Sequence, residues 1–219
     1  MKINWFAPGP PDAPAVAFEN TRLVPVLAKS VNVTVWVDES SWSAELERQA
    51  WNRRYHPDNM PWAEINGADA TIYHFTKDTS VNDPIWRVSR QHPGVVVLHD
   101  VRPQSWPLIQ DALENATAVA VDTADALSVI KKATNLPAAC LPPLSLDGDD
   151  PVAVDAYVLD IVQLVKASLQ EQSARAVAWI SRRAGRTISP WFLESAAGLL
   201  LPSVAKTISR VFDEHSAER

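Results

Sequence analysis

Residues 95–100, with the sequence Val95-Val96-Val97-Leu98-His99-Asp100, form the stretch that decides the fold. Consecutive apolar residues without polar alternation are typical of a strand covered on both faces, as in a parallel sheet between helices. Two ionisable residues follow directly. Ligands of open α/β sheets lie beyond the carboxyl ends of the strands, where the strand order reverses, so we expect His99 and Asp100 to face a crevice there. The stretch predicts the central strand of the sheet.

Strand and helix patterns alternate around this stretch. Strands are expected at 3–7, 32–37, 71–75, 118–121 and 138–141, and helices at 15–30, about 43–54, 82–92, about 105–114 and after Asp122-Thr123. The alternation predicts an α/β fold, with a Rossmann-like, mostly parallel sheet and helices on both faces. The helix at 82–92 is expected to start at Asn82, with Pro84 in its first turn.

A helical segment is expected after residue 146. Composition changes at residues 146–151, so we predict a domain at 1–146 and an α-helical C-terminal segment at 147–219 that packs on it. Apolar residues share one helical face behind the cap Asp150: Val154, Val158, Ile161, Val165 and Leu169. A second helix is expected to end at Arg183 and a third to open at Ser189-Pro190, with a last apolar stripe over 201–212.

Composition limits the functional classes. The 219 residues are 47% hydrophobic and 21% charged, which is typical of a globular protein. A single cysteine, Cys140, excludes an internal disulfide framework and indicates a cytoplasmic location. No signal peptide or transmembrane segment is expected, and the net charge of −6 disfavours nucleic acid as a partner. Peripheral membrane contact stays open through four arginines, although two of these also suit a helix C-terminus: Arg175, Arg182, Arg183 and Arg186.

The loop at 8–14 follows the first expected strand, where a strand-to-helix turn would hold phosphate. It contains a single glycine, Gly9, and therefore neither a dinucleotide-binding fingerprint nor a P-loop. Dinucleotide binding is unsupported, and no cofactor is expected.

Several short motifs, taken in order, carry a resemblance. They are KINWFAP at 2–8, RLVPVLA at 22–28, Tyr73-His74 and PGVVVLHD at 93–100. Together they resemble the N-terminal half of GT-B glycosyltransferases of the family 4 type, over roughly residues 1–145. In that family this half binds the sugar acceptor, the other half binds a nucleotide-sugar donor as co-substrate, and no metal is needed. The resemblance implies metal-independent glycosyl transfer.

The resemblance and the chemistry of the residues give candidate site residues. We expect His99 and Asp100 to be catalytic, because an imidazole can exchange a proton near neutral pH and a carboxylate can orient it or take a hydroxyl proton. The acceptor is expected to contact Pro8, Gly9, Pro10, His74, Asn82 and Trp106. An alternative stays open, in which both histidines bond to backbone and Asp100 caps the next turn.

The departures from the family matter as much as the matches. Residues 151–219 show no β-α repeat, and Glu194 lacks the second glutamate of the family's donor motif, since Pro202 stands there. Asp147-Gly148-Asp149 has the D-x-D form of a metal site in another glycosyltransferase class, but acidic side chains before a helix explain it better. The chain thus resembles a truncated enzyme that works with a donor-binding partner chain or as a homo-oligomer. Two alternatives stay open: a non-catalytic binding or assembly subunit that kept the fold, and a self-contained small-molecule enzyme whose tail covers the docking face of the missing half.

Overall fold

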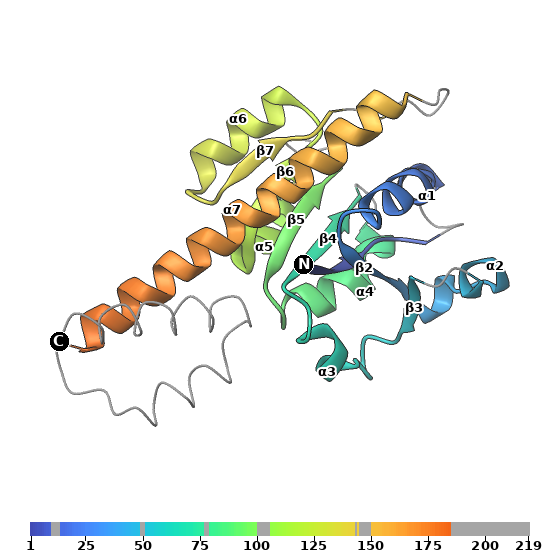
Figure 1. Ribbon diagram of the computed structural model, residues 1–219, viewed down its shortest axis with the longest axis horizontal. Coiled ribbons are helices and arrows are strands. Elements are labelled where there is room, and N and C mark those ends of the chain that lie inside the picture. The colour runs from blue at the N-terminus through green and yellow to red at the C-terminus, as the bar shows by residue number, and fades with distance from the viewer. Residues whose placement is uncertain are drawn as a thin grey trace.

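The structure of the chain is a computed structural model that describes residues 1–9, 14–48, 51–76, 79–99, 106–142, 144 and 150–184 (Figure 1). Several predictions fall elsewhere. The following lie outside the described residues: Pro10, Asp100, Asp147-Gly148-Asp149, the helix expected at Ser189-Pro190 and the stripe at 201–212. The side chains of Trp106 and of the arginines from Arg175 onward are also outside the description.

Seven strands of the described chain form one sheet. They are β1 (Lys2–Phe6), β2 (Asn32–Asp38), β3 (Asn52–Tyr55), β4 (Ala70–Phe75), β5 (Gly94–Leu98), β6 (Ala116–Val121) and β7 (Ala138–Cys140). Their order is β3-β2-β1-β4-β5-β6-β7, and every neighbouring pair is parallel. The predicted Rossmann-like α/β fold is confirmed.

The chain reverses direction across the sheet between β1 and β4. After β1 it builds outward through β2 and β3, then crosses back to β4 and continues outward to β7. The middle strand is therefore β4, and β5 lies beside it. The expectation that His99 sits at the reversal is wrong by one strand, because the run of valines only indicates burial on both faces, which β4 and β5 share.

Helices cover both faces of the sheet (Figure 1). One face packs on α1 (Pro14–Leu27) and α7 (Pro151–Ala184), and the other on α3 (Trp62–Ile65), α4 (Thr79–Ser89), α5 (Trp106–Glu114) and α6 (Ala124–Ala133). The short η1 (Glu39–Ser41) and α2 (Ala44–Glu47) follow β2. Successive strand residues point to opposite faces, so each strand feeds two cores.

The valine run of β5 shows this division. Val95 and Val97 enter the core under α1 and α7, whereas Val96 and Leu98 enter the core under α4, α5 and α6. The strand begins at Gly94, where an added Cβ would lie 2.5 Å from the Thr71 carbonyl oxygen. Only a glycine lets β5 approach β4 this closely.

The long helix α7 is part of the core. Val154, Val158, Ile161 and Val165 are buried against α1 and β6, as predicted. Each such burial stabilises the fold by about 1.5–3 kcal/mol. Asp150 caps the helix by accepting from the backbone N–H of Val152 at 3.0 Å. The expected break before a second helix is wrong, because α7 continues to Ala184 and passes beyond the strands in Figure 1.

Two further predictions are wrong. The helix expected at 43–54 shrinks to α2, and β3 takes residues 52–55 as an edge strand. Its Arg53 and Arg54 are exposed, so the strand lacks the apolar pattern that sequence reasoning requires.

Asn82 does not start α4, which begins at Thr79. The side chain of Asn82 instead accepts a hydrogen bond from the Thr76 N–H at 3.0 Å and donates one to the Thr76 carbonyl at 2.7 Å. These two bonds connect the end of β4 to α4.

No helix within the described ranges is both long and apolar enough to cross a lipid bilayer.

Candidate functional site

Three neighbouring strands bring polar side chains to one face of the sheet. His74 lies near the end of β4, His99 directly follows β5, and Asp122 directly follows β6. Each follows a residue that enters the opposite core, namely Tyr73, Leu98 and Val121. Because side chains alternate, all three polar residues turn toward α1 and α7.

The two covering helices complete this group. Glu19 comes from α1 and Tyr157 from α7, and the charges of Glu19 and Asp122 both act on the Tyr157 hydroxyl. We call these five residues the polar cluster: Glu19, His74, His99, Asp122 and Tyr157. It joins the carboxyl edge of the sheet to both helices of that face.

The two imidazoles are bonded to each other. His74 Nδ1 lies 3.0 Å from His99 Nε2, and His99 Nδ1 lies 3.8 Å from Glu19 Oε2. Beneath them, the Trp5 ring lies 4.3 Å from the His74 ring, centre to centre. His99 is therefore held through Nε2 by His74 on β4, and its Nδ1 faces Glu19 of α1 at a distance too long for a hydrogen bond.

Solvent reaches only one end of this chain of contacts. His74 is buried, whereas the His99 and Glu19 side chains keep 15% and 18% of their surface exposed. The alternative of a histidine bonded only to backbone is wrong for the described contacts, since each imidazole has a side-chain partner. A ligand arriving from solvent would meet Glu19 and the edge of His99 first.

Burial changes which group can exchange protons. Burial and the nearby Asp122 carboxylate raise the pKa of Glu19 to about 7, with Arg22 opposing. Burial lowers the pKa of His99 to about 4, and burial together with His99 holds the pKa of His74 well below its usual range. At neutral pH both imidazoles are uncharged, and Glu19 is the group poised to take or give a proton.

Sequence reasoning missed Glu19. It lies three residues after Val16 and four before Leu23, both buried on α1, so its position on the apolar face of the expected helix was visible in the sequence. A carboxylate at such a position is rarely buried without a partner, and that was the available signal.

A cavity of about 190 Å³ opens at the same edge of the sheet, toward the other face. It lies between the ends of β1, β2 and β3 and the helix α4, and is lined by Ala7, Pro8, Gly9, Asp38, Ser40, Ser41, Tyr55, Val81, Pro84 and Ile85. Two residues expected to bind the acceptor, Pro8 and Gly9, thus line a cavity. The structure places the histidine pair in a separate cluster on the face of α1 and α7.

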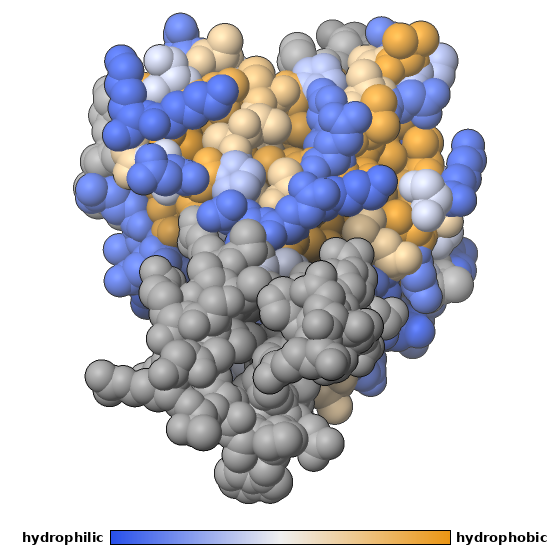
Figure 2. Space-filling view, turned by 60° about the vertical axis from the view of Figure 1, so that its left-hand side comes forward, coloured by the Kyte–Doolittle hydropathy of each residue, from blue (hydrophilic) through white to orange (hydrophobic). Residues whose placement is uncertain are grey.

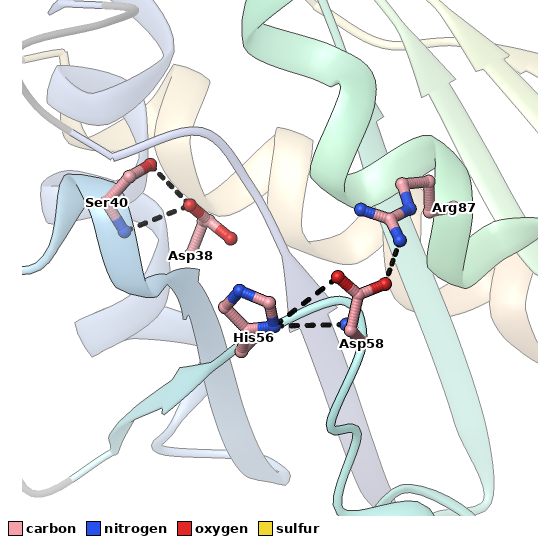
Figure 3. A network of polar contacts seen from close by, with 5 residues as sticks. All are labelled: Asp38, Ser40, His56, Asp58 and Arg87. Atoms are coloured by element: carbon pink, nitrogen blue, oxygen red, sulfur yellow. Dashed lines mark hydrogen bonds and ion pairs between the residues drawn. The ribbon is translucent and has the colours of Figure 1, made fainter.

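Polar contacts near this cavity form two groups (Figure 3). At the end of β2, Asp38 accepts hydrogen bonds from the Ser40 backbone N–H, at 3.0 Å, and from the Ser40 hydroxyl. After β3, the Asp58 carboxylate pairs with Arg87 of α4. The backbone N–H of Asp58 donates to His56 Nδ1 at 3.2 Å. Asp38 belongs to the cavity wall, whereas Asp58 is held by an exposed arginine.

Metal binding finds no support in the part of the chain that the structure describes, which brings together no group of three or more His, Cys, Asp or Glu side chains suited to an ion.

Comparison with known proteins adds no family: no protein-family model matches the chain, and no curated protein matches it significantly.

Proposed function

We propose that this chain acts in glycosyl transfer as the acceptor-binding unit, with Glu19 and His99 at the reacting end and a nucleotide-sugar held by a donor-binding unit. The observation that carries the proposal is the position of the Glu19–His99 pair. It lies at the carboxyl edge of a parallel sheet, where α/β proteins bind ligands, and it stays partly exposed. The resemblance of residues 1–145 to acceptor-binding halves points to the same edge.

Glu19 is the proton-accepting group in this proposal. His99 Nε2 is bonded to His74, and its Nδ1 lies 3.8 Å from Glu19 Oε2, so the imidazole faces the carboxylate and acts as a positioning residue. The Glu19 carboxylate lies at the exposed end, and its pKa of about 7 suits removal of a proton from an acceptor hydroxyl as that oxygen bonds to the sugar carbon and the nucleoside diphosphate leaves. Asp100, also expected to be catalytic, lies outside the described residues.

The test measures sugar transfer by the complex that the full chain forms in the cells that naturally produce it. The tagged chain is purified with its partners and co-extracted acceptors, then supplied with radiolabelled UDP-glucose, UDP-N-acetylglucosamine and GDP-mannose. We expect labelled glycan from the wild type, a loss of about 10²–10⁴-fold in Glu19→Gln, and full activity in Glu64→Gln, a change of an exposed glutamate on α3. Absence of transfer, or transfer that Glu19→Gln leaves intact, would overturn the proposal.

A second candidate function is a non-catalytic assembly subunit. Two apolar side chains of α7, Val152 and Leu159, are 74% and 56% exposed and lie one heptad apart on the same side of the helix. One side of the molecule also shows apolar surface between polar side chains (Figure 2). Such surface is typical of a partner contact.

The two functions separate by mutation. For an assembly subunit, Leu159→Asp abolishes co-purification of the partner, while Val129→Asp, a matched change of an exposed apolar residue on α6, and Glu19→Gln both leave it intact. Retention of the partner by Leu159→Asp excludes this surface as the contact.

A further inference from the structure

We propose that the cavity between β2, β3 and α4 binds a ring that carries a vicinal diol, a sugar or the ribose of a nucleoside, through Asp38 and Tyr55. The inference stands on the cavity alone and does not depend on glycosyl transfer.

The size of the cavity fits a single ring. Its volume of about 190 Å³ corresponds to roughly six water molecules at about 30 Å³ each. Pockets for drug-sized ligands span about 300–1,000 Å³, so this cavity accommodates one ring rather than an extended molecule.

Asp38 offers one acceptor to such a ring. Its Oδ1 accepts from the backbone and the hydroxyl of Ser40, which fixes the carboxylate at the end of β2. Figure 3 shows the second oxygen turned away from Ser40, and within the described part of the chain no hydrogen bond or ion pair occupies it. The second oxygen is therefore available to a ligand hydroxyl.

Tyr55 offers a donor beside it. The β2–β3 register sets Asp38 opposite Tyr55, and both line the cavity. Tyr55 is only 3% exposed, yet its hydroxyl has no hydrogen-bond partner among the described residues. Burial and the Asp38 carboxylate raise the pKa of Tyr55, so the hydroxyl keeps its proton. A buried hydroxyl without a partner is unfavourable, and a ligand oxygen would satisfy it.

The two groups together match a vicinal diol. One ligand hydroxyl donates to the free oxygen of Asp38, and the adjacent hydroxyl accepts from Tyr55. Opposite them, Val81, Pro84 and Ile85 of α4 give an apolar wall for the C–H face of a ring. Gly9 also lines the cavity: a Cβ there would lie 2.9 Å from Val37 Cγ1, so glycine suits this close approach.

The experiment titrates the full chain, uniformly ¹⁵N-labelled, with two pairs of probes by NMR. The first pair is methyl β-D-ribofuranoside and its 2-deoxy analogue, and the second is adenosine and 2′-deoxyadenosine. We expect saturable shifts at Gly9, Asp38, Ser40 and Tyr55 with at least one diol. Its deoxy partner should bind about tenfold more weakly, since one charged hydrogen bond is lost.

Variants assign the contacts. Asp38→Asn keeps the shape and an oxygen for Ser40, and should weaken the diol about tenfold, as should Tyr55→Phe. Asp58→Asn is the matched control, because this carboxylate belongs to the Arg87 pair and lies outside the cavity lining, and it should bind the diol like the wild type.

Each outcome decides the proposal. Binding of the riboside alone identifies a sugar, binding of adenosine alone identifies a nucleoside, and either supports a diol site. No saturable binding of either probe, equal binding of the deoxy analogues, or an Asp38→Asn variant that behaves like Asp58→Asn overturns it. Loss of transfer in Glu19→Gln with intact ring binding would show that the two proposals stand separately.

Discussion

The polar cluster and the cavity lie at the same edge of one sheet and differ in almost every property. The cluster, on the face of α1 and α7, joins titratable groups that are largely withdrawn from water. The cavity, on the face of α4, is open and presents a carboxylate and a hydroxyl. The difference arises because neighbouring residues of each strand point to opposite faces, so one edge supports two chemistries. The long helix α7 covers one of them.

The largest expected effect on stability comes from Trp5, which packs against the polar cluster. Trp5 is fully buried, packs on His74, and donates its indole N–H to Asn20 at 2.9 Å. Trp5→Ala should destabilise the chain by about 3–5 kcal/mol, because it leaves a void under the imidazole. Urea unfolding measures this, with Ser40→Ala on the cavity side as control. An equal loss of unfolding free energy in Trp5→Ala and Ser40→Ala would show that the cluster and the cavity do not differ in their contribution to stability.

The second effect is a pH dependence confined to the cluster. The pKa of Glu19 is raised from 4.5 to about 7, so the folded state binds more protons than the unfolded state between these values, and stability falls as pH rises through this window. The full difference is about 3 kcal/mol. His99, with its pKa lowered from 6.5 to about 4, acts in the opposite direction, with stability rising between these values. The two contributions largely cancel in the wild type.

Glu19→Gln removes the contribution of Glu19 to the pH dependence of stability and leaves that of His99. Its free energy of unfolding should rise with pH from about 4 to 6.5 and lack the fall toward pH 7, so its advantage over the wild type grows as pH increases. Denaturant unfolding at pH 5, 6, 7 and 8 measures the difference. A difference between the two proteins that does not change with pH would show that Glu19 is not buried as described.

A smaller effect compares two tyrosines. The hydroxyls of Tyr157 in the cluster and Tyr55 in the cavity are both buried without a hydrogen-bond partner among the described residues. Each Tyr→Phe change should stabilise the free protein by about 1 kcal/mol, because an unsatisfied polar group is removed. Thermal unfolding measures this. Only Tyr55→Phe should also weaken ring binding, and a similar weakening by Tyr157→Phe would merge the two regions into one site.

The smallest effect is expected at the surface beside the cavity. The Asp58–Arg87 ion pair is exposed, and Asp58→Asn should change the free energy of unfolding by about 0–1 kcal/mol. A larger loss in chemical denaturation would mean that this pair supports the cavity wall, and Asp58→Asn would then fail as a control for Asp38→Asn.

The local patterns of the sequence predicted the interior strands and the edge strand β7, but not the opposite edge strand β3. The valines before His99 indicate a buried strand on composition alone, and His74 and His99 were placed at strand ends. Asn52–Tyr55 lacks such a pattern, because an edge strand pairs on one side and its arginines face water. Local patterns also cannot give strand order, so the neighbour of β1 was not known.

The candidate site was predicted in part for a similar reason. Pro8 and Gly9 were expected to bind a ligand and line a cavity, but Asp38 and Tyr55 contribute through the β2–β3 register, which no local pattern contains. Glu19 joins His99 through packing of α1 on the sheet. The pairing of distant residues therefore required the tertiary structure.

The length of α7 has a mechanical consequence. A helix of 34 residues spans about 51 Å at 1.5 Å per residue, whereas a five-residue strand spans only about 17 Å. Its first half packs in the core from Val154 to Leu169, and its far end projects past the strands. A rigid rod held along one half is a lever, so a small sideways pull on the distal turns would act as a torque on the packed half that carries Tyr157.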